Sequence, residues 1–201
     1  MSKSTLYTSL IYSVLFVGLC IVSLTTPWYV MNFDIKDTTL EPSGSKYLYF
    51  TKMYITVPSL DESEYLSYHD DLDTETAAVF KVSLICLIAG LAFIILNVIF
   101  LLFALFRHFQ RGKKLAAFTM VCAMVAIGIS FFQFIRVIDA IETDGLCDDS
   151  YDTTRETICN KFLGTLDDDY LYASYYPTFG WWSLYGCIMF GLVSLIATIK
   201  S

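Results

Sequence analysis

Four long apolar stretches constrain the fold of this chain more than any other feature of its sequence. A helix needs about 20 apolar residues to cross the roughly 30 Å hydrocarbon core of a bilayer. Four segments meet this requirement: Leu6–Thr26, Ala77–Phe106, Leu115–Ala140 and Thr178–Ile199. Only 16% of the 201 residues are charged, against about 25% in an average soluble domain. The sequence therefore predicts an all-α membrane protein, a single domain with four membrane-spanning helices.

Charge is distributed unevenly over the segments between these stretches. The short loop 107–114 carries four basic residues and no acidic residue, whereas loops 27–76 and 141–177 carry nineteen of the 20 acidic residues. The positive-inside rule predicts both termini and loop 107–114 in the cytosol, and the two acidic loops outside, as in a multi-pass plasma-membrane protein. The net charge of −7 excludes a general nucleic-acid-binding protein, which needs a basic surface.

The first outer loop has the pattern of a small β-structure. Met31, Phe33 and Ile35 alternate with polar residues, which is the period of a half-buried strand. The segment Lys46–Val57 is rich in aromatic and β-branched residues. We predict an antiparallel pair that joins residues 29–36 to this segment. Because a two-stranded hairpin is marginal in water, it needs a further strand or a helix from the second outer loop.

Two signals mark the segment before the second apolar stretch. Ser59 followed by Glu62 fits a capping box, which predicts a short helix. Asp73 or Thr74 is the expected N-cap of the second span.

The second outer loop contains two cysteines, Cys147 and Cys159. Outside the cytosol two such cysteines form disulfides, so we expect a bridge between them. In the chain-entropy model a loop of this length contributes roughly 3 kcal/mol. Free thiols or an intermolecular bridge are the alternatives.

The segment Pro27-Trp28-Tyr29-Val30 follows the first span and opens the first predicted strand. With the four spans, the longer first outer loop and the short basic loop, it resembles the claudin, peripheral myelin protein and channel-auxiliary-subunit superfamily. In that family a Trp after the first span opens the outer sheet. The family's Gly-Leu-Trp motif and cysteine pair in the first outer loop are absent here. The resemblance implies a four-helix transmembrane bundle with a small extracellular cap of strands and helix.

The resemblance also implies a function without catalysis. We expect an auxiliary or structural subunit of a larger membrane complex, such as a channel or receptor, that binds through its acidic outer cap and a bundle face. The candidate recognition residues of the cap are Trp28, Tyr29, Phe33 and Tyr49. Claudin-like self-assembly for adhesion or barrier formation is the alternative, and an oligomeric pore ranks last. The expected partners are other integral membrane proteins, in a hetero-complex rather than a homo-oligomer, and lipids.

Five polar residues lie within or at the ends of the predicted spans: Lys81, Asn97, Gln133, Arg136 and Asp139. We expect Asn97 and Gln133 to form interhelical hydrogen bonds. The three charged residues have two interpretations. They line an ion path or a partner contact, or they form an interfacial ion pair with side chains that reach toward the headgroups, and we favour the second.

The remaining charged residues carry weaker signals. We interpret Arg107, Arg111, Lys113 and Lys114 as determinants of orientation, with contact to anionic lipid headgroups as the alternative. The acidic clusters lack the glycine-centred loop of a specific Ca²⁺ site, so we interpret them as a solvated acidic surface. The spans contain no histidine and one carboxylate, which argues against an enzyme or a cofactor site.

Overall fold

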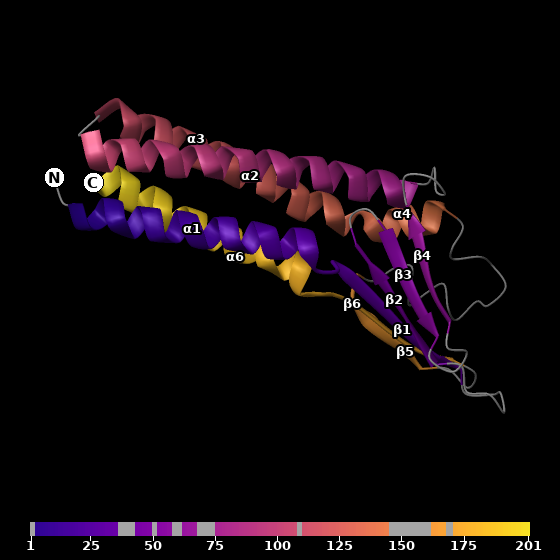
Figure 1. The fold of residues 1–201 in the computed structure, drawn as a ribbon. Helices are drawn as coiled ribbons and strands as arrows, with labels where there is room; N and C mark the ends of the chain where they lie inside the picture. The colour runs from indigo at the N-terminus through magenta and orange to yellow at the C-terminus, as the bar shows by residue number, and fades with distance from the viewer. Residues whose placement is uncertain are drawn as a thin grey trace. The chain divides into compact units, whose positions relative to one another are not determined.

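The structure is a computed structural model that describes residues 3–35, 43–49, 52–57, 62–67, 75–107, 110–144, 162–167 and 171–201. Figure 1 shows its elements, whose chain order is α1 (Lys3–Thr25), β1 (Tyr29–Ile35), β2 (Ser43–Leu48), β3 (Lys52–Val57), β4 (Glu62–Ser67), α2 (Glu75–Arg107), α3 (Gln110–Ile135), α4 (Val137–Thr143), β5 (Gly164–Asp167), β6 (Leu171–Pro177) and α6 (Phe179–Lys200). The chain is mostly helical with one β-sheet, as the sequence predicts.

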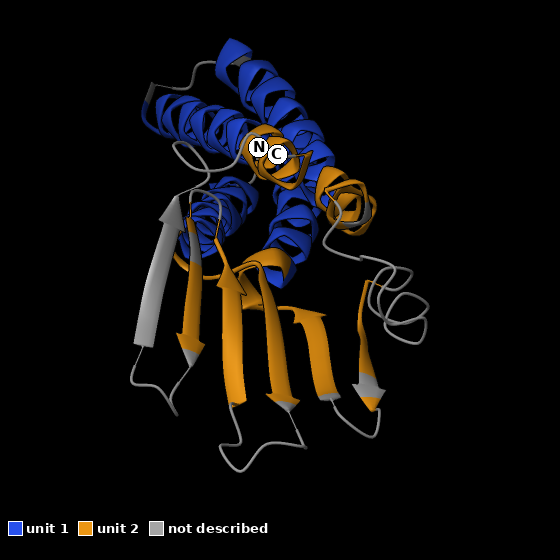
Figure 2. Ribbon diagram, turned by 90° about the vertical axis from the view of Figure 1, so that its right-hand side faces the viewer, with its two compact units in different colours: residues 1–24, 84–131, 182–201 blue, residues 25–83, 132–181 orange. Residues whose placement is uncertain are grey.

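The chain divides into two compact units, which are coloured separately in Figure 2. The first, here called the helical unit, comprises residues 1–24, 84–131 and 182–201. The second, here called the sheet unit, comprises residues 25–83 and 132–181.

Four helices, α1, α2, α3 and α6, are long and apolar enough to cross a membrane. Their buried residues recur at alternating spacings of three and four, the heptad spacing of helices that pack along a seam. On α1 the buried residues are Leu6, Ser9, Ser13, Phe16, Cys20 and Ser23. On α6 of the helical unit they are Ser183, Leu184, Cys187, Gly191, Ser194 and Thr198, and the spacing of three and four holds from Leu184 onward. Small residues at the seam let helix backbones approach closely, as in membrane proteins.

Large apolar side chains lie on the outer surface of the same helices. Ile85, Phe103, Phe118 and Ile196 are each about half exposed or more. Large apolar side chains such as Phe16, Ile94 and Met120 also fill the interior, so these helices are apolar inside and outside. Such extensive apolar exposure is compatible with a hydrocarbon environment.

The third apolar stretch departs from its predicted bounds. Instead of one helix over Leu115–Ala140, α3 ends at Ile135 and α4 begins at Val137. The amide of Arg136 donates to the carbonyl of Gln133 at 3.1 Å, three residues back, and α-helical bonding resumes with Ala140 donating to Arg136 at 3.0 Å. Apolar periodicity continues through this point, so it does not reveal the break.

The sheet has six strands in the order β4-β3-β2-β1-β6-β5, and all neighbours are antiparallel. The expected strand from the second loop is present, because β6 pairs with β1 from Tyr29↔Pro177 to Ile35↔Leu171. Pairing segments distant in sequence gives the hairpin the additional strands that its stability requires.

The predicted strand Lys46–Val57 is wrong, because it comprises two strands, β2 and β3. Leu48 pairs with Met53, and the amide of Tyr49 donates to the carbonyl of Lys52 at 2.9 Å to close the turn. Residues 49–52 contain no Gly, Pro, Asn or Asp, so the turn has no sequence signal.

The predicted short helix after Ser59 is also wrong within the described residues, because Glu62–Ser67 forms strand β4. Its backbone pairs with β3, with Tyr54 opposite Tyr65. An available sheet edge overrides a local capping signal, since it satisfies the backbone along the whole segment. Ser59, Asp73 and Thr74 lie outside the described residues.

An unpredicted carboxylate caps helix α2. The two side-chain oxygens of Asp144 accept hydrogen bonds from the amides of Glu75 and Thr76 at 2.8 and 2.9 Å. These amides are among the four at a helix start that have no intrahelical partner. Asp144 follows α4, so the cap comes from a residue 68 or more positions away in the chain.

Phe134 is the centre of the aromatic core of the sheet unit. Its ring centroid lies 4.9 Å from Trp28, 5.2 Å from Phe80, 6.0 Å from Phe162 and 6.3 Å from Tyr29. The contacts to Trp28, Phe80 and Phe162 are edge-to-face, the arrangement that aromatic quadrupoles favour. This cluster holds helical and sheet segments of the unit together.

Candidate recognition surface

The strand register sorts the sheet into two faces. Directly opposite residues share a face, and one face, here called the packed face, carries Tyr29, Leu48, Ala173, Tyr175 and Pro177, all buried. Tyr29 joins this face to the aromatic core around Phe134. The opposite side, here called the open face, comprises Val30, Asn32, Asp34, Ser43, Ser45, Tyr47, Lys52, Tyr54, Thr56, Thr165, Asp167, Tyr172, Ser174 and Tyr176.

The first row across the open face holds three tyrosines and Val30, which is itself buried. From β3 to β6 the row consists of Tyr54, Tyr47, Val30 and Tyr176, each directly opposite the next. The rings of Tyr47 and Tyr54 stack with their centroids 6.3 Å apart. Tyr176 is 46% exposed at the end of this row.

The second row consists of hydroxyl and amide groups. Its members in order across five strands are Thr56, Ser45, Asn32, Ser174 and Thr165. The Ser45 hydroxyl donates to Asn32 Oδ1 at 2.8 Å, and Asn32 Nδ2 donates to Ser174 Oγ at 3.3 Å. These bonds fix the rotamer of Asn32 in the middle of the sheet.

The third row is acidic at two of its four positions. Asp34 lies opposite both Ser43 and Tyr172, and Tyr172 lies opposite Asp167. Asp34, Asp167 and Tyr172 are all exposed. The open face thus combines rigid aromatic rings, preorganised hydroxyl and amide groups, and negative charge. Tyrosine with serine and asparagine is the composition of antibody paratopes.

The structure gives the residues predicted for recognition different positions. Trp28 and Tyr29 are 0% and 1% exposed, so both side chains pack inside the sheet unit. The Tyr29 hydroxyl donates to the carbonyl of Phe162 at 2.8 Å, and its burial raises the pKa of this phenol above its usual value. Phe33 lies on the packed face opposite Gly44. Tyr49 is half-buried beside β3, with the Lys52 amine 5.6 Å from its ring centre.

The open-face tyrosines are the residues that sequence reasoning missed. Alternation within each strand separates its two faces, but it does not say which face packs. Both faces of these strands carry aromatic residues, since Tyr175 is buried and Tyr176 is exposed. Only the position of the aromatic core decides between them.

A basic residue also lies on the packed face. Lys46 is opposite Met31 and Ile55 in the register. Removal from water lowers the pKa of this ammonium group from its usual value. Withdrawing this charged group from water lowers the stability of the folded sheet unit.

Asn97 forms interhelical hydrogen bonds in the helical unit, as predicted. Its Oδ1 accepts from Ser13 Oγ of α1 at 2.9 Å, and its Nδ2 donates to the main-chain carbonyl of Ala116 of α3 at 2.6 Å. Ser13 Oγ also lies 2.9 Å from Ser194 Oγ of α6. The contacts therefore link all four long helices through one buried polar cluster.

The hydroxyl groups of this cluster satisfy one another. Ser9 Oγ lies 2.6 Å from Thr198 Oγ1, and Ser194 Oγ donates to the Ser9 carbonyl at 3.0 Å. Ser9 Oγ in turn is 3.1 Å from the Ser194 carbonyl. With Ser13 donating to Asn97, each hydroxyl proton has its own acceptor. The available sequence signal was the spacing of four between Ser9 and Ser13 on the first apolar stretch and between Ser194 and Thr198 on the last.

The other predicted polar residues of the spans are less buried. Lys81, Arg136 and Asp139 are exposed. Gln133 is half-buried, and the structure shows no interhelical hydrogen bond of its side chain to another described residue. Cys147 and Cys159 lie outside the described residues. Within the described ranges, no group of three His, Cys, Asp or Glu residues could hold a metal ion.

The chain matches no protein-family model and no curated protein.

Proposed function

We propose that this chain is a multi-pass membrane protein that serves as an auxiliary or structural subunit of a larger membrane complex. The observation that carries this proposal is the open face of the sheet, where exposed tyrosines, hydroxyl groups and carboxylates share one surface. The activity is recognition rather than catalysis, and the partner is another integral membrane protein.

Membrane insertion is supported by the four long apolar helices and by their outward-facing large side chains. The uneven distribution of charge between the two units supports one orientation in the membrane. The residue ranges of the helical unit contain six basic residues and no acidic residue, whereas those of the sheet unit contain all 20 acidic residues and seven basic ones. By the positive-inside rule, the basic ends of the helices face the cytosol and the sheet unit lies outside, at the plasma membrane.

The partner surface follows from the chemistry of the open face. Tyrosines contribute large contact areas at low entropic cost. Asp34 and Asp167 favour a partner with basic residues at the contact, and this attraction weakens as salt rises. We therefore infer a basic extracellular surface on the partner.

The test uses gentle detergent extraction from native membranes, a native gel, and mass spectrometry of the band that contains the chain. The double substitution Tyr172→Ser and Tyr176→Ser removes two exposed rings of the open face. The control is Tyr185→Ser, which removes a similarly exposed ring (53%) from α6 in the helical unit. We expect a large band with a second polypeptide, lost in the double variant and retained in the control.

Self-assembly like that of claudins is the competing function. It predicts a ladder of the chain alone, and that result contradicts the subunit proposal. The sheet edges disfavour pairing between copies, because β5 has only four residues and β4 carries Glu62 and Glu64. Short or charged edge strands resist edge-to-edge association.

A further inference from the structure

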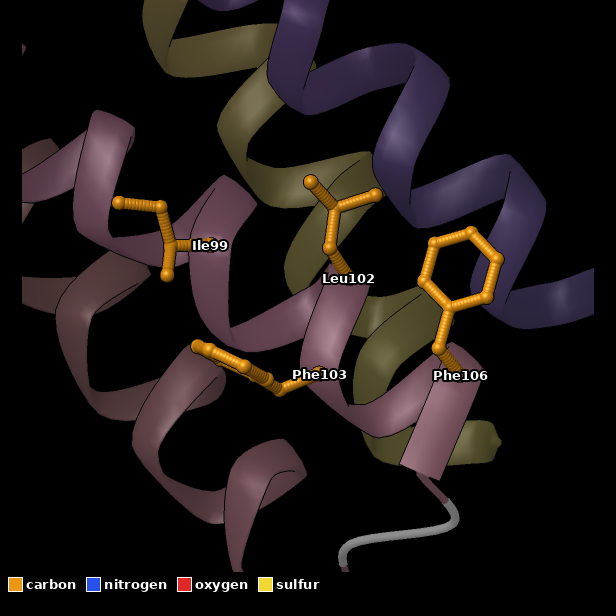
Figure 3. A pocket seen from close by; sticks show the side chains of 4 residues that line it. All are labelled: Ile99, Leu102, Phe103 and Phe106. Atoms are coloured by element: carbon orange, nitrogen blue, oxygen red, sulfur yellow. The ribbon is translucent and has the colours of Figure 1, made fainter.

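An apolar groove lies on the surface of the helical unit, along the last two turns of α2. Its lining is Ile99, Leu102, Phe103 and Phe106, and its volume is about 340 Å³. Figure 3 shows these four side chains projecting from α2. They follow the spacing of one helix stripe, over about 10 Å of helix length. The described residues of the lining are all apolar.

Basic residues gather where the groove ends. Phe106 is followed directly by Arg107, and Arg111, Lys113 and Lys114 lie in the first turns of α3. Figure 1 shows the ends of α2 and α6 and the starts of α1 and α3 at the same end of the helical unit, which brings Lys3 and Lys200 to that end too.

These cations have no carboxylate side chain within their own unit, since its residue ranges contain no Asp or Glu. Arg111, Lys114, Lys3 and Lys200 are exposed. A cluster of uncompensated cations at one end of an apolar helix surface attracts anions at the bilayer interface. A ligand with an anionic head and an apolar chain would therefore fit both the charge and the groove.

We propose that this surface binds an anionic phospholipid, with one acyl chain in the α2 groove and the phosphate at the basic α2–α3 end. The binding rests on membrane insertion, and it is independent of the partner surface on the sheet. It goes beyond a role of the basic residues in orientation, because it requires the groove as well as the charge.

The test is native mass spectrometry of the full chain with added phosphatidylglycerol or phosphatidylcholine of identical acyl chains. We expect phosphatidylglycerol to bind at least about tenfold more tightly. Each surface cation contributes roughly a fivefold factor to the affinity for an anionic lipid. The double variant Arg111→Gln with Lys114→Gln should therefore bind phosphatidylglycerol about 30-fold more weakly and bind phosphatidylcholine with unchanged affinity. Lys81→Gln, which removes an exposed cation of the sheet unit, is the matched charge control.

A second pair of variants tests the groove. Leu102→Trp fills it and should abolish the tight binding of phosphatidylglycerol, whereas Ile129→Trp enlarges an exposed residue of α3 and should not. Equal binding of the two lipids overturns the proposal, as does a phosphatidylglycerol preference that survives Leu102→Trp. Stabilisation by glycerol phosphate equal to that by the lipid also contradicts it, because glycerol phosphate has no chain for the groove. None of these outcomes depends on the open face, so a failure here leaves the proposed subunit function standing.

Discussion

The hydroxyl of Ser13 on α1 donates to Oδ1 of Asn97 on α2 across 2.9 Å, in the fully buried interior of the helical unit. The same amide reaches the Ala116 carbonyl of α3, and the same hydroxyl reaches Ser194 of α6. Directional bonds between helices define their register, which apolar contacts alone define poorly because they tolerate sliding. Asn97 therefore joins α2 directly to α1 and α3, and Ser13 extends the cluster to α6.

The substitution Asn97→Leu should destabilise the helical unit. It removes both bonds of the amide and leaves Ser13 without its acceptor on α2, at an expected cost of about 0.6–2 kcal/mol. The measurement is the thermal unfolding midpoint of the full chain in detergent. Leu96→Ala, at an adjacent position that is 42% exposed, is the control. Equal midpoints for the two variants would show that the polar cluster adds no stability.

Phe134→Ala should strongly destabilise the sheet unit. The ring contacts four aromatic neighbours and is fully buried, and comparable truncations cost about 3–5 kcal/mol. Phe132→Ala, two residues away and 65% exposed, should cost much less. Near-ultraviolet circular dichroism of the aromatic residues reports the change. A similar loss of signal in both variants would argue against a core centred on Phe134.

Gly44→Ala should destabilise the sheet. A Cβ at this position would overlap the ring of Phe33 and lie 3.0 Å from the Thr56 carbonyl, so the expected cost is about 1–3 kcal/mol. Gly18→Ala in α1 is the control, because nothing lies within 4 Å of its added Cβ. The control should be neutral or slightly stabilising, since alanine favours helix. The measurement is the unfolding midpoint of each variant against that of the wild type. An unchanged midpoint for Gly44→Ala would refute the close packing of Phe33 on Gly44.

Asp144→Ala should weaken the start of α2. Loss of the cap exposes two amides without a partner, at about 0.5–2 kcal/mol. Asp144→Asn keeps one side-chain oxygen as an acceptor, so it should destabilise the start of α2 less than the alanine variant does. Hydrogen exchange of the amides of Glu75 and Thr76 measures the effect directly. Unchanged protection of both amides in the alanine variant would rule out the cap.

Lys46→Met should stabilise the sheet unit by roughly 1 kcal/mol at pH 7, because it removes a half-buried charge. Burial lowers the pKa of Lys46 in the folded state, so between that pKa and the ordinary value the unfolded chain binds more protons. Stability of the wild type therefore rises with pH through this window, and the advantage of the variant shrinks. Unfolding midpoints from pH 7 to about 9.5 test this.

If the unfolding midpoints of the wild type and Lys46→Met differ by the same amount at every pH in that range, the lowered pKa of Lys46 is contradicted. Above about pH 10 both proteins should lose stability. Burial raises the pKa of Tyr29, so the unfolded phenol ionises while the folded one stays neutral.

Several features of the fold could be read from the order of residues alone. Four helices are long enough to cross a bilayer, because uninterrupted apolar runs leave the backbone no other way to satisfy its polar groups in lipid. The interhelical role of Asn97 was predictable for a related reason, since a lone amide in an apolar run needs a partner. The strand character of 29–35 followed from strict alternation.

Other features depended on contacts between distant segments. The turn at Tyr49 has no turn residue, and Glu62–Ser67 becomes a strand only because β3 offers an edge. The cap at Glu75 comes from Asp144, and no local pattern joins two residues so far apart.

The sequence by itself determined how many helices are long and apolar enough for a bilayer, because length and hydropathy are local properties that every residue carries with it. Tertiary structure alone decided that Trp28 and Tyr29 are buried while Tyr172 and Tyr176 are exposed. All four are aromatic residues of the same region, and alternation gives them no preference for one side. The difference between Tyr29 and the two exposed tyrosines follows from which face of the sheet packs on Phe134, and Trp28 reaches the same ring from just before β1. These relationships exist only once β1 and β6 pair.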